Sequence, residues 1–141
     1  MRAAIAAVTV LLAACAGQNQ PAILTTTAMS DQAVRSIVRA ALEADASGAP
    51  ADTLYMLGAT IVADGRVRVV NPRFAGIQRG GQISITGLQA EIASGLAWAI
   101  TDYRWIANDR HTGAIGRATL ILETLGSGWK IKHVHSSSIQ P

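Results

Sequence analysis

The sequence predicts an α+β domain in which helix comes first and antiparallel strands follow. Apolar residues recur at helical spacing between positions 30 and 48, whereas from position 60 onward they alternate with polar residues as in half-exposed strands. Glycine-containing turn signals separate the later segments from one another. Because helices and strands do not alternate along the chain, an α+β arrangement is favoured over an alternating α/β fold.

Residues 1–14 have the parts of a secretory signal peptide. Arg2 supplies the positive start, residues 3–12 are apolar, and small residues follow. The apolar stretch is too short to cross a bilayer as a stable anchor. The sequence therefore predicts that residues 1–14 are removed.

The order Leu12-Ala13-Ala14-Cys15-Ala16 resembles the lipobox of bacterial prolipoproteins. The resemblance implies that the Cys15 thiol is lipidated, that the chain is cut just before it, and that the new amine is acylated. The expected partner is then a membrane of the bacterial cell envelope, either the outer membrane or the periplasmic face of the inner membrane. Two alternatives stay open: secretion after cleavage at Ala16, and retention of the segment in the membrane.

Charge and cysteine content limit the classes of function. The 12 basic residues exceed the 9 acidic ones only slightly and are scattered, so nucleic-acid binding is not expected. Cys15 is the only cysteine, and its lipidation would leave no thiol for a disulfide, a metal or catalysis. No cofactor is predicted. We expect residues 15–29 to be the lipidated cysteine and a tether, and residues 30–141 to form one domain.

The first regular element of that domain is predicted at Ser30. Ser30 is a suitable N-cap, and Asp31 in the first turn favours the helix dipole. The helix is expected to end near Gly48, and a short second helix is expected from Asp52 to Leu57. One face of the first helix collects its apolar residues, which are Ala33, Val34, Ile37, Val38, Ala41 and Leu42.

The remaining elements are predicted to be strands. Asp64-Gly65 suits a hairpin turn between strands at 60–63 and 66–70, because both positions tolerate positive φ. Further strands are expected at 82–87, 95–106, 115–125 and 129–137.

The C-terminal run Gly128-Trp129-Lys130-Ile131-Lys132-His133-Val134-His135-Ser136-Ser137, with the preceding strand at 116–123, resembles the last hairpin of SnoaL-like domains in the NTF2-like superfamily. The segments 63–66, 72–77 and 98–105 occur in a compatible order. The resemblance implies a cone-shaped, curved antiparallel sheet packed on N-terminal helices, with a pocket between helix and sheet. Such domains serve as isomerases, cyclases, dehydratases, ligand binders and association modules, so the fold does not select a function.

Strand periodicity suggests which side chains share the pocket. In the last strand Trp129, Ile131, His133 and His135 have the same parity. If that face is concave, His133 joins a ligand site and His135 can act as general acid or base. The alternative is that both histidines are structural or lie at the rim. A zinc site is not expected, because no carboxylate follows the pair at a useful spacing.

Other candidates lie upstream. Asp102 shares a face with Trp98, and desolvation beside that ring would raise its pKa toward base chemistry, although pairing with Arg104 or Arg117 is the more ordinary role. Arg73 could bind a ligand carboxylate bidentately or be a solvated loop residue. Steroid isomerases of the superfamily need an aspartate base with a tyrosine and a protonated acid as oxyanion donors. The residue types are present in Tyr55, Tyr103, Asp64 and Asp102, but no local motif fixes their relative positions.

Two functions of different classes follow. In the first, a lipid-anchored module uses the pocket to bind a small, partly apolar ligand, or binds a protein partner. In the second, a SnoaL-like or ketosteroid-isomerase-like enzyme uses His135 or Asp102 as general acid and base. A homodimer formed through the outer face of the sheet is compatible with either.

Overall fold

The computed structural model describes residues 22–139, with side chains from Ser30 onward. Cys15 and the predicted signal peptide lie outside the described residues. A long helix, α1 (Ala22–Ser47), is followed by a short 3-10 helix, η1 (Asp52–Leu54). Six strands follow these helices: β1 (Tyr55–Ala63), β2 (Arg66–Val67), β3 (Gly81–Ala93), β4 (Leu96–Ala107), β5 (Gly113–Leu125) and β6 (Gly128–Ile139). Within residues 22–139, no helix is long and apolar enough to cross a bilayer.

The helix α1 begins earlier than predicted. It starts at Ala22 rather than at Ser30, so residues 22–29 are helical and not part of an extended tether. No glycine or proline interrupts the sequence from Ala22 to Ser47, and nothing therefore forces a cap at Ser30. The predicted end is confirmed. Gly48 has a φ of 76°, and the Ala49 N–H donates to the Ala44 carbonyl over 2.9 Å, as in a Schellman cap.

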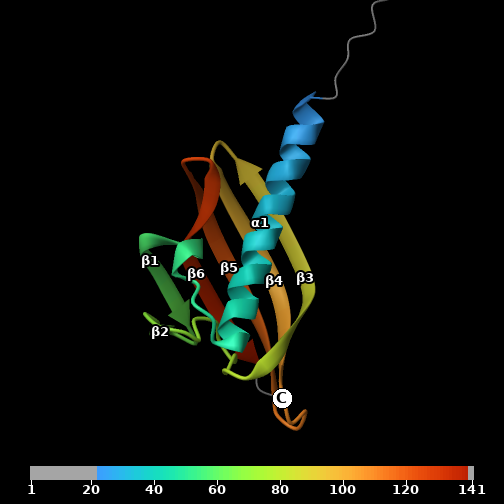
Figure 1. Ribbon diagram of the computed structural model, residues 1–141, viewed down its shortest axis with the longest axis vertical. Coiled ribbons are helices and arrows are strands. Elements are labelled where there is room, and N and C mark those ends of the chain that lie inside the picture. Colours follow the sequence, from blue (N-terminus) through green and yellow to red (C-terminus); the bar gives the residue numbers. More distant parts are fainter. Residues whose placement is uncertain (1–21, 140–141) are drawn as a thin grey trace, which may run out of the picture.

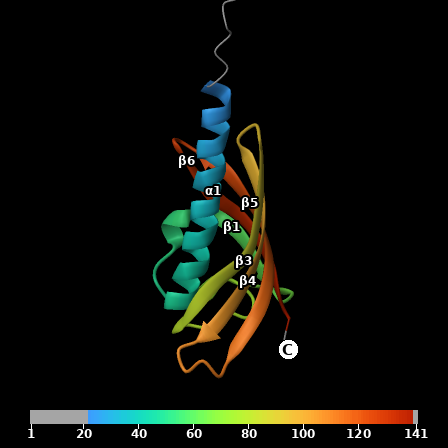
Figure 2. The ribbon, with the colours of Figure 1, turned by 90° about the vertical axis from the view of Figure 1, so that its right-hand side faces the viewer.

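The six strands form one curved sheet in the order β2-β1-β6-β5-β4-β3. All neighbours are antiparallel except β1 and β6, which run parallel. The sheet curls around α1, which covers its concave face, and the opposite face, called here the outer face, carries no helix (Figures 1 and 2). This arrangement confirms the predicted α+β cone, with one long helix in place of several.

Two local predictions had different outcomes. The Asp64-Gly65 hairpin is confirmed, since both residues have positive φ and β1 pairs with β2 across them. The strand expected at 82–87 is longer, because β3 runs to Ala93. A register shift between Ile85 and Gly87 reverses the alternation of inward and outward side chains there. The second half of the strand therefore does not continue the two-residue period of the first half.

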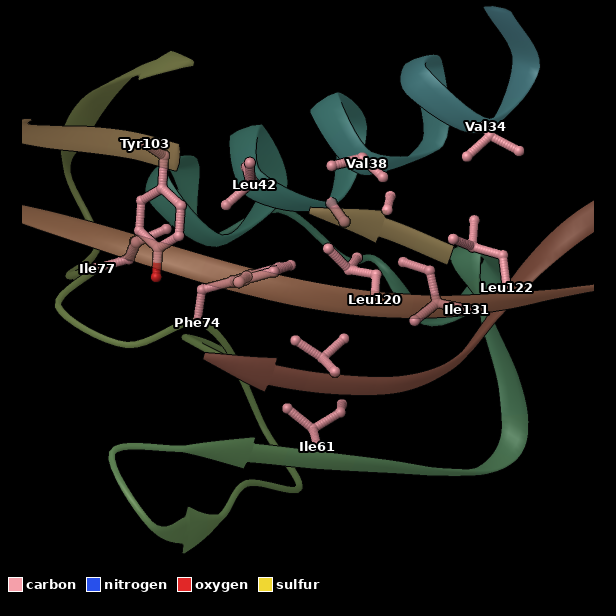
Figure 3. Packing of buried hydrophobic residues seen from close by; sticks show 14 of the residues in the cluster. Val34, Val38, Leu42, Ile61, Phe74, Ile77, Tyr103, Leu120, Leu122 and Ile131 are labelled. Atoms are coloured by element: carbon pink, nitrogen blue, oxygen red, sulfur yellow. The ribbon is translucent and has the colours of Figure 1, made fainter. Parts of the chain in front are cut away.

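The core lies between α1 and the concave face. Its helix residues Val34, Val38 and Leu42 pack toward Leu120, Leu122 and Ile131 of β5 and β6 (Figure 3). On β4 the inward residues include Ala97 and Ala99, whose small side chains let the helix approach the sheet closely. At one end, Phe74 from the loop after β2 meets the ring of Tyr103 edge to face at 6.1 Å. These side chains therefore fill the space between α1 and the concave face of the sheet.

Candidate functional site

A β-bulge in β6 separates the residues that were predicted to share one face. Ile121 pairs with His133 and Leu122 with Ile131, so Lys132 has no partner in the ladder. Beyond the bulge, Val134 and Ser136 are the buried residues, and His135 is exposed. The prediction that His133 and His135 share the face of Trp129 and Ile131 is therefore wrong. Period two holds only within an uninterrupted ladder.

Asp102 lies on the outer face of β4 and is bound by Arg117. The Arg117 Nε and Nη2 atoms donate to its two carboxylate oxygens at 2.6 and 3.0 Å. These hydrogen bonds, together with the charge of Arg117, lower the pKa of Asp102. The expected desolvation and raised pKa are thus wrong, and the ordinary pairing with Arg117 is what the sheet contains. A strongly ionised, paired carboxylate is a poor proton acceptor.

The predicted apolar pocket residues also separate. Ile131 is fully buried in the core, and Trp129 packs against it. Trp98 instead lines a groove of about 330 Å³ on the outer face, together with Leu96 and Ile121. The sheet itself thus lies between Trp98 and the other two residues.

Tyr55 and Arg73 are the two predicted residues that the fold brings together. The Arg73 guanidinium carbon lies 4.3 Å from the centroid of the Tyr55 ring, a cation–π contact. Both line a cleft of about 530 Å³ along β1, called here the β1 cleft. The other residues lining it are Asp52, Met56, Leu57, Gly58, Ala59, Ile61, Arg68 and Val69.

Asp45, near the end of α1, binds the backbone of the loop at Arg73. Its side chain is fully buried, and one oxygen accepts hydrogen bonds from the backbone N–H groups of Arg73 and of Phe74, the latter at 2.7 Å. Burial raises the pKa of Asp45, and those two hydrogen bonds and the positive charge of Arg73 oppose the rise. Sequence reasoning missed this residue. The available signal was a carboxylate one turn beyond Ala41, on the buried stripe of an amphipathic helix.

The cluster contains donors without partners. Among the described residues, the Nε and Nη1 atoms of Arg73 and the hydroxyl of Tyr55 are buried and make no hydrogen bond. Only Arg73 Nη2 is engaged, at 2.5 Å from an Asp52 oxygen. Burial, reinforced by the negative charge of Asp45, raises the pKa of Tyr55 and keeps its phenol protonated. A guanidinium and a neutral phenol together can donate to an oxyanion.

The loop that carries Arg73 is anchored at its other side. The Tyr103 hydroxyl donates to the Ala75 carbonyl at 2.7 Å, and the Ala75 N–H donates to Ser136 Oγ at 3.0 Å. Burial raises the pKa of Tyr103. Because each of these polar groups has a partner in the loop, they position Arg73 and are not themselves free for a ligand.

Comparison with known proteins agrees with this architecture. Residues 31–141 match the model of the SnoaL-like domain. No curated protein matches the sequence. Among solved structures, a candidate dehydratase of the NTF2-like family from Streptomyces avermitilis is similar, with a TM-score of 0.65 at 14% identity, covering 82% of this chain and 99% of that one.

Two further structures show the same fold. A Caulobacter vibrioides protein with a cystatin-like fold has a TM-score of 0.60 at 15% identity, covering 80% of this chain and 92% of its own. A candidate ketosteroid isomerase from Shewanella frigidimarina has a TM-score of 0.57 at 21% identity, covering 77% and 97%. At these identities the likeness concerns the fold alone.

Proposed function

We propose that this chain, which belongs to the SnoaL-like domain family, is a lipid-anchored envelope protein whose domain binds a small, partly apolar anion in the β1 cleft. The envelope location rests on the sequence around Cys15. The ligand rests on one observation, namely the buried, unpartnered donors of Arg73 and Tyr55 beside the cleft. Leaving such groups without partners costs free energy that a ligand oxyanion would recover.

The lining of the cleft suits a ligand with both an apolar and an anionic part. Leu57 is fully exposed and Val69 is 80% exposed, so an apolar group laid over them would leave water. Arg68 adds a second positive charge to the lining. The side chain of Asp52 is 83% exposed, and its movement away from Arg73 would open the guanidinium to the ligand.

Binding is favoured over turnover by the composition of this cleft. Among the described residues, its lining contains no histidine and a single carboxylate, Asp52, which is ion-paired with Arg73. The two residues predicted to act as general acid and base, Asp102 and His135, lie on the outer face of the sheet. The cleft thus offers groups that hold a ligand, without a free base beside them.

The ligand can be tested by calorimetry with decanoate and with decanol, which share an apolar chain and differ in charge. We expect saturable binding of decanoate and weaker binding of decanol. Tyr55→Phe keeps the ring over Arg73 and removes only the donor, so it should weaken decanoate binding about tenfold. Arg68→Gln should also weaken it.

Arg66→Gln is the matched control, because Arg66 is exposed, carries the same charge and does not line the cleft. It should leave the affinity unchanged. Absence of saturable binding, or equal affinity of all three variants and the unaltered protein, would contradict the proposed ligand site.

We also propose that the outer face joins two copies of the chain. Trp98, Ile100 and Ile121 lie there at 50, 38 and 38% exposure, which is an unusual gathering of large apolar side chains in contact with water. Charged residues of both signs flank them, in the pairs Asp102–Arg117 and Glu123–Lys132. A two-fold interface needs such a self-complementary surface.

The dimer is checked by light scattering of the purified protein. We expect the mass of two chains for the unaltered protein and of one chain for Ile100→Asp, because an isologous contact places both new carboxylates in the buried centre. Gln32→Asp adds the same charge on an exposed position of α1 and should stay dimeric. A monomeric unaltered protein at micromolar concentration would overturn this assignment.

A further inference from the structure

A second cleft is lined by residues of the hairpin between β4 and β5. That hairpin lies at the opposite end of the molecule from the start of α1 (Figure 1). Its volume is about 580 Å³, within the range of small-molecule sites. We call it the hairpin cleft. Its polar lining residues are Gln82, Arg104, Asn108, Arg110, His111 and Thr112. The cleft shares no lining residue with the β1 cleft, so it stands independently of the ligand proposed there.

The charged side chains that line the hairpin cleft are positive. Arg104 and Arg110 line it, and among residues 30–139 no carboxylate side chain does. Within residues 30–139, neither arginine takes part in an ion pair. The nearest acidic residues in the sequence are Asp102 and Asp109.

Those two acidic residues have other partners. Asp102, two positions before Arg104 on the same strand face, has both oxygens bound by Arg117. One oxygen of Asp109 accepts the backbone N–H of His111 at 2.9 Å, which stabilises the turn. The arginines of the cleft therefore have no ion-pair partner within residues 30–139, and the exposed Asp109 carboxylate, which accepts only backbone N–H groups, keeps its negative charge next to Arg110 in the chain.

The arginines are carried on a well-defined backbone. Arg104 lies within β4, where it pairs with Ser84 on one side and Ile115 on the other. The turn bearing Arg110 is closed by hydrogen bonds from Ala107 N to Thr112 O at 2.8 Å and from Arg110 N to Ala107 O at 2.9 Å. A site built on fixed backbone loses less entropy when it binds a ligand.

We propose that the hairpin cleft binds a small organic oxyanion, bearing phosphate or carboxylate groups. Each guanidinium can donate two parallel hydrogen bonds to such a group. The amides of Gln82 and Asn108 and the imidazole of His111 supply further hydrogen-bonding groups at the rim. The volume accommodates more than a single inorganic ion, and two arginines favour a ligand with more than one anionic group.

The site is tested by titrating the purified full-length protein with pyrophosphate and, separately, with citrate, at constant ionic strength. The readout is the amide NMR spectrum. We expect saturable shifts confined to residues around 82, 104 and 108–112. Whichever of the two anions binds more tightly identifies the oxyanion class.

Arg104→Gln and Arg110→Gln should each weaken binding about tenfold. Arg39→Gln, an exposed residue of α1, removes the same charge at a distance and should leave the affinity unchanged. Two results would overturn the proposal: shifts that grow linearly without saturation for both anions, or an equal loss of affinity in all three variants.

Discussion

Replacing Asp45 with alanine is expected to lower the free energy of unfolding by about 3–5 kcal/mol, the usual cost of removing one partner of a buried charged cluster. The substitution leaves the backbone N–H groups of Arg73 and Phe74 without an acceptor and the Arg73 guanidinium without its buried counter-charge. Denaturant unfolding followed by circular dichroism measures the loss.

Asp45→Asn is the matched control for this prediction. Asparagine keeps an oxygen that accepts the two N–H groups and removes the charge, whose burial raises the pKa of Asp45. It should therefore cost much less than alanine. A loss as large for Asn as for Ala would show that the charge, rather than the acceptor, stabilises the loop.

The same carboxyl gives a pH dependence of known sign. Its folded pKa is raised, so the folded state holds the proton more tightly than the unfolded state does. As the pH falls from above that raised pKa toward the ordinary value of 3.8, this group adds stability to the folded state. Subtracting the Asp45→Asn profile from that of the unaltered protein isolates the contribution, and the opposite slope would contradict the assigned shift.

Replacing Cys15 with serine is expected either to release the protein from the membrane fraction into the soluble fraction or to leave its signal peptide uncleaved. Acyl chains hold a protein to a bilayer by about 0.8 kcal/mol per buried methylene, and serine offers no thiol to carry them. Fractionation and incorporation of labelled palmitate measure the change. The thermal unfolding midpoint of the domain should stay the same, because the core residues with described side chains all lie beyond Ser30, far along the chain from Cys15.

Ala16→Ser is the control for the anchor, since it changes a neighbouring small residue and keeps the thiol. It should remain in the membrane fraction and incorporate label. Retention of Cys15→Ser in the membrane fraction, without label in either variant, would contradict lipidation and leave some other means of membrane attachment.

Much of the fold could be predicted because its signals are local. The apolar stripe Val34, Val38, Ala41 and Leu42 predicts the helix, and Asp64-Gly65 predicts the hairpin. The direction in which β4 faces could not be predicted from polarity. In its first half the inward side chains Ala97 and Ala99 are small, and the larger apolar residues Trp98 and Ile100 lie outside, whereas in its second half Tyr103 and Trp105 point inward.

The candidate site could be predicted only in part, because it depends on strand pairing and long-range contacts that the two-residue period of a strand does not specify. The bulge at Lys132 reverses the sheet face on which the two histidines would otherwise lie. The bulge depends on pairing with β5, which the β6 sequence alone does not reveal. Tyr55 and Arg73 were identified individually. Their contact arises because buried Asp45 draws the Arg73 loop onto the end of α1, a long-range interaction that no sequence spacing specifies.

The most direct measurement of the proposed function is the amide NMR spectrum of the protein titrated with decanoate. We expect saturable shifts that cluster along the β1 cleft, at Tyr55, Leu57, Arg68, Val69 and Arg73. Shifts confined to the outer groove around Trp98, or the absence of saturable shifts, would contradict it.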